Sequence, residues 1–326
     1  MGDIQTIHLI QNPNAQNWVL GENHPTQGRR FLYATETLEA LAAEQAIELV
    51  SHPARVATKT ELERVHTPEY VQQVLILERS GEWEGERIDL SQLAAEFAGG
   101  TLVALDQILA GAKLAVNLPG AKHHAQANRS SGFCVFGDFA LAAKVLVKDH
   151  NLRVAILDID AHHGDGTENL TRDDDAILTF SIHEGALFPY SAMNHEASES
   201  VHNRPLAAGA GDDELVVAVQ DFIDTAKVFA PDVILVAAGG DGHLHDPLSS
   251  LQYSEAAFAH VGALLRNAFP ETPFLVGGAG GYRPDDYTPA MWLHIILALA
   301  GHSENQISEL NINNRISKVR AAHEAN

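Results

Sequence analysis

Residues 154–167 read Val-Ala-Ile-Leu-Asp-Ile-Asp-Ala-His-His-Gly-Asp-Gly-Thr, an apolar run that ends in a cluster of acids and histidines. The run Val154–Ile159 has the length of a strand, and the continuous apolar stretch Val-Ala-Ile-Leu with which it begins suits a parallel sheet that is covered on both faces. Asp158, Asp160 and His162 are spaced by two, so an extended backbone directs all three side chains to one side. This stretch therefore predicts a buried strand that delivers polar groups to its C-terminal end.

Short β-rich runs alternate with longer amphipathic segments, which predicts an α/β fold with a central, mostly parallel sheet and helices on both faces. Since no Pro- or Ser-rich linker interrupts the pattern, residues 1–326 are predicted to form one domain. The expected strands are Ile4–Ile10, Leu114–Leu118, Val154–Ile159, Ile177–Ile182, Val233–Ala238 and Phe274–Gly277. The expected helices are Glu36–Val50, Glu69–Glu78, Ala94–Leu109, Phe139–Asp149, Glu214–Phe229, Ser254–Ala268 and Pro289–Ala300, and long loops are expected at Gly85–Leu93 and Ala186–Asp213.

The charge of the chain limits its partners. The 43 acidic and 21 basic residues give a formal net charge of −22, so nucleic acid and anionic lipid, which need clustered Lys and Arg, are not expected as partners. A cationic substrate would be attracted, although solubility or salt adaptation explains the charge equally well. The single cysteine, Cys134, excludes internal disulfides, and together with an N-terminus unlike a signal peptide and no apolar stretch of 18 residues it predicts a cytoplasmic protein.

Polar residues collect directly after four of the predicted strands, where open parallel sheets bind their ligands. Asp160 and His162 follow one strand, and Asp241 follows Val233–Ala238. Two carboxylates and an imidazole can hold one divalent metal and leave a position open, which is the pattern of catalytic rather than structural zinc sites. The alternative is that these aspartates cap helices or end strands.

A histidine pair, His123-His124, follows the strand Leu114–Leu118. Asp158 and Asp165 remain after the metal ligands are assigned, so each histidine can have one orienting carboxylate. Tyr282 follows the glycine-rich run after Phe274–Gly277, where its phenol could donate a hydrogen bond to a developing oxyanion. The alternative is a flexible turn that ends in a core or rim tyrosine.

Several segments resemble the zinc-dependent histone deacetylase family, which includes bacterial acetoin-utilisation proteins and acetylpolyamine amidohydrolases. They are His123-His-Ala, Ser131-Gly-Phe-Cys-Val-Phe, Leu157–Thr167, Ser181-Ile-His, Asp246-Pro-Leu and Gly280-Gly-Tyr, with a weaker match at Glu63–Val71. The resemblance implies an arginase/deacetylase-like fold. It also implies that the substrate is an acylated amine, such as an acetyl-lysine protein, an acetylpolyamine or a small N-acyl amine, from which an acetyl or other short acyl group is removed.

The resemblance implies a role for each matching position. Zn²⁺, or Fe²⁺ in its place, would be bound by Asp160, His162 and Asp241. The catalytic pair would be His123 and His124, supported by Asp158 and Asp165 respectively, with Tyr282 on the carbonyl oxygen. Substrate would meet the aromatic walls Phe133 and Phe188 and the neighbouring Gly132, Gly280 and Leu248. A structural K⁺ would be held at Asp158, Asp160, His162, Ser181 and Ile182.

Two departures from the family concern the substrate. The carboxylate that grips the substrate backbone in many deacetylases would fall near Leu93, where no Asp stands, and Leu248 occupies the place of an acidic gatekeeper found in a polyamine-selective relative. Two other functions stay open. A binuclear manganese ureohydrolase shares the fold, but it needs an acid where this chain has Gly164. A non-catalytic acyl-amine binding protein would keep the fold without turnover. A homo-oligomer is compatible with either.

Overall fold

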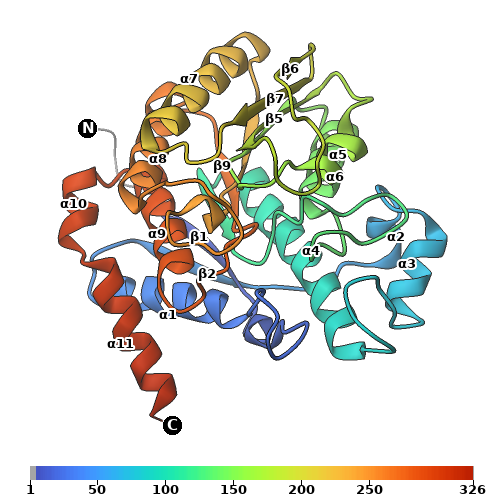
Figure 1. Ribbon diagram of the computed structural model, residues 1–326, viewed down its shortest axis with the longest axis horizontal. Helices are drawn as coiled ribbons and strands as arrows, with labels where there is room; N and C mark the ends of the chain where they lie inside the picture. The colour runs from blue at the N-terminus through green and yellow to red at the C-terminus, as the bar shows by residue number, and fades with distance from the viewer. Residues whose placement is uncertain (1–4, 326) are drawn as a thin grey trace.

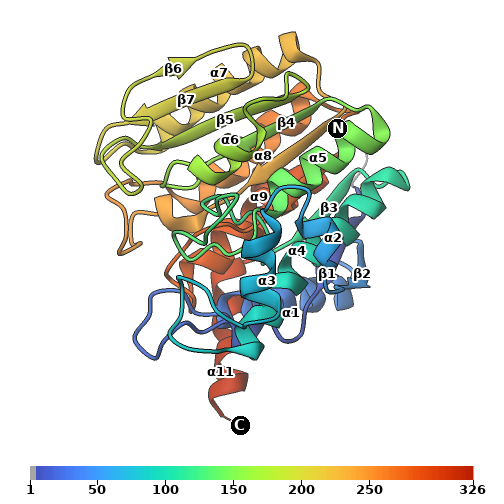
Figure 2. The same ribbon diagram turned by 90° about the vertical axis from the view of Figure 1, so that its right-hand side faces the viewer.

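The computed structural model describes residues 5–325, which form a nine-stranded sheet in the order β2-β1-β3-β9-β8-β4-β5-β7-β6. Eight strands run parallel, and the short β6 pairs antiparallel to β7 at one edge. Figure 2 shows the strands fanning from β6 and β7 at one end of the sheet to β1 and β2 at the other. The strands are β1 (Ile7–Gln11), β2 (Leu49–Pro53), β3 (Leu114–Asn117), β4 (Val154–Asp158), β5 (Ile177–Glu184), β6 (Glu196–Ala197), β7 (Val201–Leu206), β8 (Val233–Ala237) and β9 (Phe274–Gly277).

Helices cover both faces of the sheet (Figure 1). One layer holds α4 (Ile88–Leu109), α5 (Asp138–His150) and α6 (Asp165–Thr171), with α2 (Lys59–Leu62) and α3 (Pro68–Leu75) at its outer end. The other layer holds α1 (Arg29–Ala43), α7 (Asp212–Phe229), α8 (Glu255–Ala268) and α9 (Tyr287–Ala300), with α10 (Glu304–Glu309) and α11 (Ile312–Glu324) outside it. Two short 3-10 helices complete the chain, η1 (Ala15–Asn17) and η2 (Gly240–Gly242). The predicted α/β class is confirmed.

The core explains why the central strands carry no alternation of polar residues. Every residue of β3, β4, β8 and β9 is buried, because helices shield both faces. Helix α9 is apolar almost all round and is buried along nearly its whole length, since it lies between the sheet and the helices α1, α8 and α11. None of the described helices is long and apolar enough to span a membrane.

Two predictions of local structure in the first hundred residues are wrong. The segment Glu36–Val50 was expected to be one helix, but α1 is Arg29–Ala43 and Val50 belongs to the edge strand β2. The apolar face of α1 begins with Phe31, which a window starting at Glu36 misses. Helix α4 likewise begins at Ile88, so most of the expected loop Gly85–Leu93 is helical.

The expected long loop Ala186–Asp213 also needs correction, because it contains β6 and β7. Strand β7 reads Val-His-Asn-Arg-Pro-Leu, and this polar sequence has neither an apolar run nor a regular alternation. It forms a strand because it pairs with β5 near the edge of the sheet, where tertiary contacts outweigh local preference. The expected strand Ile4–Ile10 corresponds to β1, except that Ile4 lies outside the described residues.

Candidate active site

Four neighbouring strands, β3, β9, β8 and β4, bring their C-terminal ends to one edge of the sheet. The loops that follow these strands carry His123 and His124, Tyr282, Asp241, and the segment from Asp160 to Asp165. Because the strands are adjacent and parallel, segments up to about 160 residues apart in the sequence lie side by side. The structure thus brings together the polar groups that follow separate strands in the sequence.

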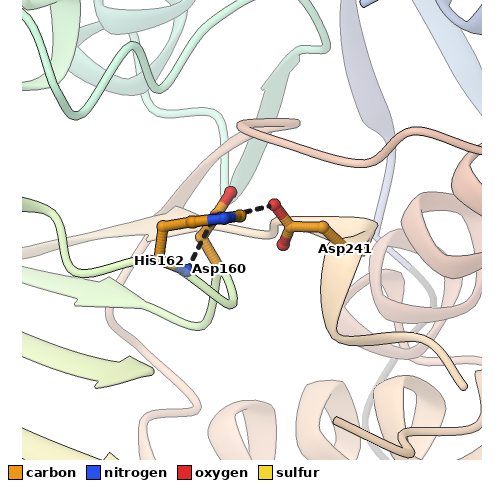
Figure 3. Close-up of side chains that lie close together, drawn as sticks. All are labelled: Asp160, His162 and Asp241. Carbon is orange, nitrogen blue, oxygen red and sulfur yellow. Dashed lines mark hydrogen bonds and ion pairs between the residues drawn. The ribbon is translucent and has the colours of Figure 1, made fainter. Parts of the chain in front are cut away.

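Asp160, His162 and Asp241 form a buried group whose candidate ligand atoms all lie within 4.8 Å of one another (Figure 3). His162 Nδ1 is 3.1 Å from Asp160 Oδ1 and 3.1 Å from Asp241 Oδ2. A tetrahedral zinc site with bonds near 2.0 Å has ligand–ligand edges of about 3.3 Å, so these separations match a shared ion. Within residues 5–325 this is the one group of three or more His, Cys, Asp or Glu side chains with such spacing. A binuclear ureohydrolase would need a second metal site, so this observation disfavours that alternative.

The electrostatics of this group favour a bound cation. Burial and then the charge of Asp160 raise the pKa of Asp241, since two carboxylates this close resist joint ionisation. Burial alone would lower the pKa of His162, but its hydrogen bonds to Asp160 and Asp241 raise it strongly. Without a metal, a proton on His162 compensates the charge of the two carboxylates. A divalent cation between the three side chains would compensate that charge more fully, so the residues present fit a metal ion.

Backbone amides hold the two carboxylates in position. The Ala161 amide donates to Asp241 Oδ1 over 2.8 Å, and the Gly280 amide donates to Asp160 Oδ2 over 2.7 Å. Any side chain at Gly280 would overlap the carboxylate oxygens of Asp241 and Asp160, so the close approach of this loop requires glycine.

Each histidine of the pair has its own aspartate. His123 Nδ1 lies 2.7 Å from Asp158 Oδ2, and His124 Nδ1 lies 2.7 Å from Asp165 Oδ1. The two rings are neighbours, with centroids 4.0 Å apart. These bonds fix Nδ1 of each ring as the nitrogen that faces a carboxylate, so Nε2 of each ring is left for chemistry.

The two histidines titrate in opposite directions. Burial would lower the pKa of His123, but Asp158 and Asp160 outweigh it and raise that pKa to about 9. Burial and the adjacent His123 lower the pKa of His124 to about 4, although Asp165 opposes the shift. At neutral pH the pair therefore holds one protonated and one neutral ring, a division typical of sites that need both an acid and a base.

Aromatic side chains border the histidines. The Phe188 ring lies 5.0 Å from the His124 ring, and the Phe133 ring lies 6.0 Å from the Tyr282 ring. Gly132 lies against the His124 and Phe188 rings, and a side chain at this position would overlap both of them. The Asp246 carboxylate accepts hydrogen bonds from the Tyr282 amide over 2.7 Å and the Leu248 amide over 3.0 Å, which places Leu248 at the same rim.

The phenol of Tyr282 stays protonated across the physiological range. Burial, followed by the charges of Asp241 and Asp160, raises its pKa well above the usual value. Tyr282 is therefore a hydrogen-bond donor near the candidate metal ligands rather than a phenolate.

Of the residues expected to bind potassium, Asp160 and His162 are also candidate metal ligands, whereas Asp158, Ser181 and Ile182 lie on the paired strands β4 and β5. Asp158 and Ser181 both line a small cavity between β4, β5 and α6, and Ile182 follows Ser181 on the buried strand β5. The Asp160 amide donates to Asp158 Oδ1 over 3.1 Å, so this cavity and the candidate metal centre share one backbone segment.

The structure also brings in residues to which the sequence gave no role. Gln126 donates to Asp165 Oδ2 over 2.8 Å, and so it braces the carboxylate that orients His124. His66 accepts from the Gly137 amide and donates to the Gln126 carbonyl oxygen, each over 2.9 Å. The family-like segment Glu63–Val71 was a signal for His66, but nothing in the sequence pointed to Gln126.

Three further residues, Thr26, Arg30 and Lys122, line a cavity against His123 and Tyr282. All three are more than nine-tenths buried. Lys122 directly precedes the histidine pair, which could have drawn attention to it, whereas Thr26 and Arg30 lie before and in α1, where no motif marks them.

Comparison with known proteins shows what this chain is similar to. A model of the histone deacetylase domain matches residues 24–299. The acetoin utilization protein AcuC of Bacillus subtilis is 32% identical over 319 residues, covering 90% of this chain and 82% of that protein. AcuC of Staphylococcus aureus (strain MRSA252) is 32% identical over 306 residues, covering 85% of this chain and 77% of that protein.

Solved structures agree in fold. An HDAC homologue complexed with SAHA superposes with a TM-score of 0.78 at 25% identity, covering 97% of this chain and all of that chain. The HD domain of HDA15 superposes with a TM-score of 0.80 at 21% identity, covering 99% of this chain and all of that one. The expected arginase/deacetylase-like fold is confirmed.

Proposed function

Because this chain belongs to the histone deacetylase family, we propose that it is a zinc-dependent amidohydrolase that removes an acetyl or other short acyl group from a primary amine. The family supports deacetylase activity in general. The observation that carries the finer proposal is the buried Asp160–His162–Asp241 group facing two histidine–aspartate pairs.

The proposed metal is Zn²⁺, with Fe²⁺ as the alternative, held by Asp160, His162 and Asp241. When bound, such an ion supplies Lewis acidity to a carbonyl group and lowers the pKa of a bound water toward ~7. Two observations support this assignment: the separations between the candidate ligand atoms suit one shared ion, and two carboxylates are buried beside one imidazole.

His124 is the proposed general base. Its lowered pKa leaves the ring neutral at pH 7, and Asp165 holds Nδ1, so Nε2 can take a proton from the attacking water and later give it to the leaving amine. Such a proton transfer contributes roughly 10²- to 10⁴-fold. His123, whose pKa is raised, stays protonated beside Asp158 and balances the charge that develops at the carbonyl.

Tyr282 is the proposed donor to the carbonyl oxygen as it becomes an oxyanion. Its raised pKa keeps the phenolic proton in place. Phe133 and Phe188 provide aromatic walls for a neutral alkyl stem, since an unpaired charge there would be costly to desolvate. Gly132, Gly280 and Leu248 complete the proposed substrate contacts.

We further propose a structural K⁺ at Asp158, Asp160, His162, Ser181 and Ile182. We also propose that residues 1–326 form one catalytic domain and that the protein acts in the cytoplasm, in keeping with its single buried cysteine, Cys134. The partner is the acylated amine itself. A homo-oligomer is compatible with this function, and the net charge of −22 disfavours nucleic acid.

The test is turnover by purified zinc-loaded protein of acetyl-lysine peptides, acetylpolyamines and small N-acyl amines. We expect release of free amine from at least one class, together with a loss of activity of about 10²-fold or more in His124→Ala. Tight binding of acyl amines without turnover under zinc or iron(II) would instead indicate a binding protein.

A further inference from the structure

A tight turn carries Phe133, one of the two proposed aromatic walls. The Ser131 and Cys134 backbones exchange two hydrogen bonds, of 3.0 Å and 2.9 Å, across this turn. Its two central residues both have a positive φ, 55° at Gly132 and 64° at Phe133. Positive φ at both central residues is the pattern of a type I′ turn, in which Asn and Gly are favoured and a bulky side chain is strained. The conformation of Phe133 therefore needs support from outside the turn.

A carboxylate from a distant segment gives that support. Glu82 Oε2 accepts a hydrogen bond from the Phe133 amide over 2.9 Å. The bond that closes a two-residue turn uses the amide of the residue after the two central ones, so it leaves the Phe133 amide unbonded. The two residues are 51 positions apart in the sequence, and so the tertiary structure brings this donor and this acceptor together.

The position of the Glu82 carboxylate is unfavourable for its charge. Glu82 is partly buried, and this burial raises the pKa of its carboxyl, whereas the hydrogen bond from the Phe133 amide lowers that pKa. In the described part of the chain, residues 5–325, no ion pair joins Glu82 to a Lys, Arg or His. A carboxylate withdrawn from water without a counterion is costly unless hydrogen bonds compensate the loss. The Phe133 amide supplies such a bond, so this contact explains why the carboxylate lies here.

The loop that carries Glu82 is held on both sides of this residue. Before it, the Gly81 amide donates to Ser130 Oγ over 3.0 Å, which ties the loop to the segment leading into the turn. After it, Trp83 is buried, and its Nε1 donates to the Glu78 carbonyl oxygen over 2.9 Å. Because both neighbours are held, the loop presents the carboxylate at a defined place beside the turn.

The turn lies against the proposed catalytic groups. The centroid of the Phe133 ring is 6.0 Å from that of Tyr282. Gly132 packs so closely against the rings of His124 and Phe188 that a side chain there would overlap both. A shift of the turn would therefore change the distance between the Phe133 ring and the other groups that border the site.

Building on the function proposed above, we propose that Glu82 is a positioning residue for the hydrolase: it holds the Phe133 amide, and thereby keeps the Phe133 ring where the ring contacts the alkyl stem of the acylated amine. Glu82 acts through Phe133, and the ring contacts a part of the substrate that does not react. Binding of this kind is equal in the ground state and the transition state, so its loss raises KM and leaves kcat.

The first experiment measures KM and kcat of the zinc-loaded enzyme for an acetyl-lysine peptide. Glu82→Ala should raise KM by about tenfold and leave kcat within about threefold. Glu82→Gln should keep KM within about twofold of the wild-type value, since its amide oxygen can still accept from the Phe133 amide. Glu84→Ala, at an exposed position of the same loop, is the matched control.

Two results of this experiment would overturn the proposal. One is a wild-type KM in Glu82→Ala. The other is a defect that Glu82→Gln does not relieve, or that falls on kcat as much as on KM, because a general loss of structure would produce it. If Glu82→Ala does not fold, Glu82→Met, which keeps the length of the side chain, takes its place in the comparison.

A double-mutant cycle tests whether Glu82 acts through the aromatic ring. Phe133→Leu removes the ring and keeps the backbone amide. In that background, Glu82→Ala should raise KM by less than about twofold, because no ring is left to be positioned and the two changes are coupled. A further tenfold rise in KM would show that Glu82 acts independently of the ring and would contradict the proposal.

Hydrogen exchange of the Phe133 amide tests the contact without any turnover. This amide should exchange faster by about tenfold or more in Glu82→Ala and at nearly the wild-type rate in Glu82→Gln, since only the first variant removes the acceptor. Unchanged exchange in Glu82→Ala would show that the carboxylate does not hold the amide.

The Kd of the zinc-loaded protein for the acetyl-lysine peptide separates failure of this proposal from failure of the proposed function. If no acyl amide is hydrolysed but Glu82→Ala weakens binding about tenfold and Glu82→Gln restores it, the hydrolase function fails and Glu82 still positions the ring for binding. If amides are hydrolysed but KM and Kd of Glu82→Ala match the wild type, the positioning role fails and the hydrolase stands. A wild-type protein that neither binds nor hydrolyses the peptide would overturn both.

Discussion

The candidate active site has two walls of opposite chemistry. The carboxylate wall, which comprises Asp158, Asp160, Asp165 and Asp241, is partnered by backbone amides, histidine rings and the side chain of Gln126. The facing wall, which we call the cationic wall, comprises Thr26, Arg30 and Lys122, and its Thr26 Oγ1 and Arg30 Nε are buried with no hydrogen-bond partner. Polar groups that satisfy one another make a rigid framework, whereas polar groups left unsatisfied mark a place where stability is given up for a ligand. The difference separates the residues that hold the reaction centre from those that line the neighbouring cavity.

The largest effect is expected when one charge is removed from the carboxylate wall. Asp241→Asn keeps an oxygen for the Ala161 amide but loses the negative charge. We expect activity to fall by at least about 10³-fold, because a catalytic metal contributes several kcal/mol. Metal content measured on the purified variant should fall well below one ion per chain. Asp213→Asn, at the exposed start of α7, is the control, and a variant that retains both zinc and activity would contradict the assignment.

Tyr282 stands between the two walls, and its hydroxyl is expected to act only during the reaction. Tyr282→Phe should lower kcat by about 10²- to 10³-fold, the usual effect of losing one oxyanion donor. None of the hydrogen bonds in residues 5–325 is made by the Tyr282 hydroxyl, so Tm should change little. Tyr33→Phe on α1 is a matched control. Wild-type kcat in Tyr282→Phe would remove the tyrosine from the mechanism.

His66 supports the carboxylate wall from outside, through Gln126, and predicts a dependence of stability on pH. Burial lowers the pKa of His66 to about 4, below its value of about 6.5 in the unfolded chain. As pH falls from 6.5 toward 4, His66 takes up a proton in the unfolded state but stays neutral in the folded state. The free energy of unfolding therefore decreases in that window, and the contribution of His66 is fully present above pH 6.5. The loss from this residue should approach about 3 kcal/mol at pH 4, at about 1.4 kcal/mol per pH unit.

Urea unfolding at pH 7, 6 and 5 measures this loss. Since other buried histidines also titrate, the comparison is with His66→Gln, which should be less stable at pH 7 but should lose less stability on acidification. Equal slopes in the two proteins would mean that His66 does not carry the effect.

The smallest expected effect tests the cationic wall through stability alone. Lys122→Met replaces a buried ammonium with an apolar side chain of similar length. Burial, followed by repulsion from Arg30, lowers the pKa of Lys122 to about 8, so at pH 7 the folded protein bears the cost of a buried charge. We expect the ligand-free variant to be more stable by about 1–3 kcal/mol. Thermal unfolding of the ligand-free proteins at pH 7 measures this difference. A clear drop in Tm of Lys122→Met would show instead that Lys122 stabilises the folded protein.

The sequence by itself determined the fold class and most of the carboxylate wall. Strands β4 and β8 are continuous apolar runs, and Asp158, Asp160 and His162 lie on one such run and its extension, so their relative placement follows from the geometry of a single extended segment. Motifs of this local kind can be recognised before any tertiary contact is known. Strand β7 could not be, since only its pairing with β5 makes it a strand.

Only the tertiary structure decided the protonation of the histidines and the existence of the cationic wall. His123 and His124 are adjacent in the sequence, yet their pKa values shift in opposite directions: Asp158 and Asp160 outweigh burial at His123, whereas burial and the neighbouring His123 outweigh Asp165 at His124. Arg30 and Lys122 come from distant segments and are unremarkable until both are buried at one cavity. The physical reason is that charge and hydrogen-bond energies depend on burial and on neighbours brought together by the fold, which a local pattern does not encode.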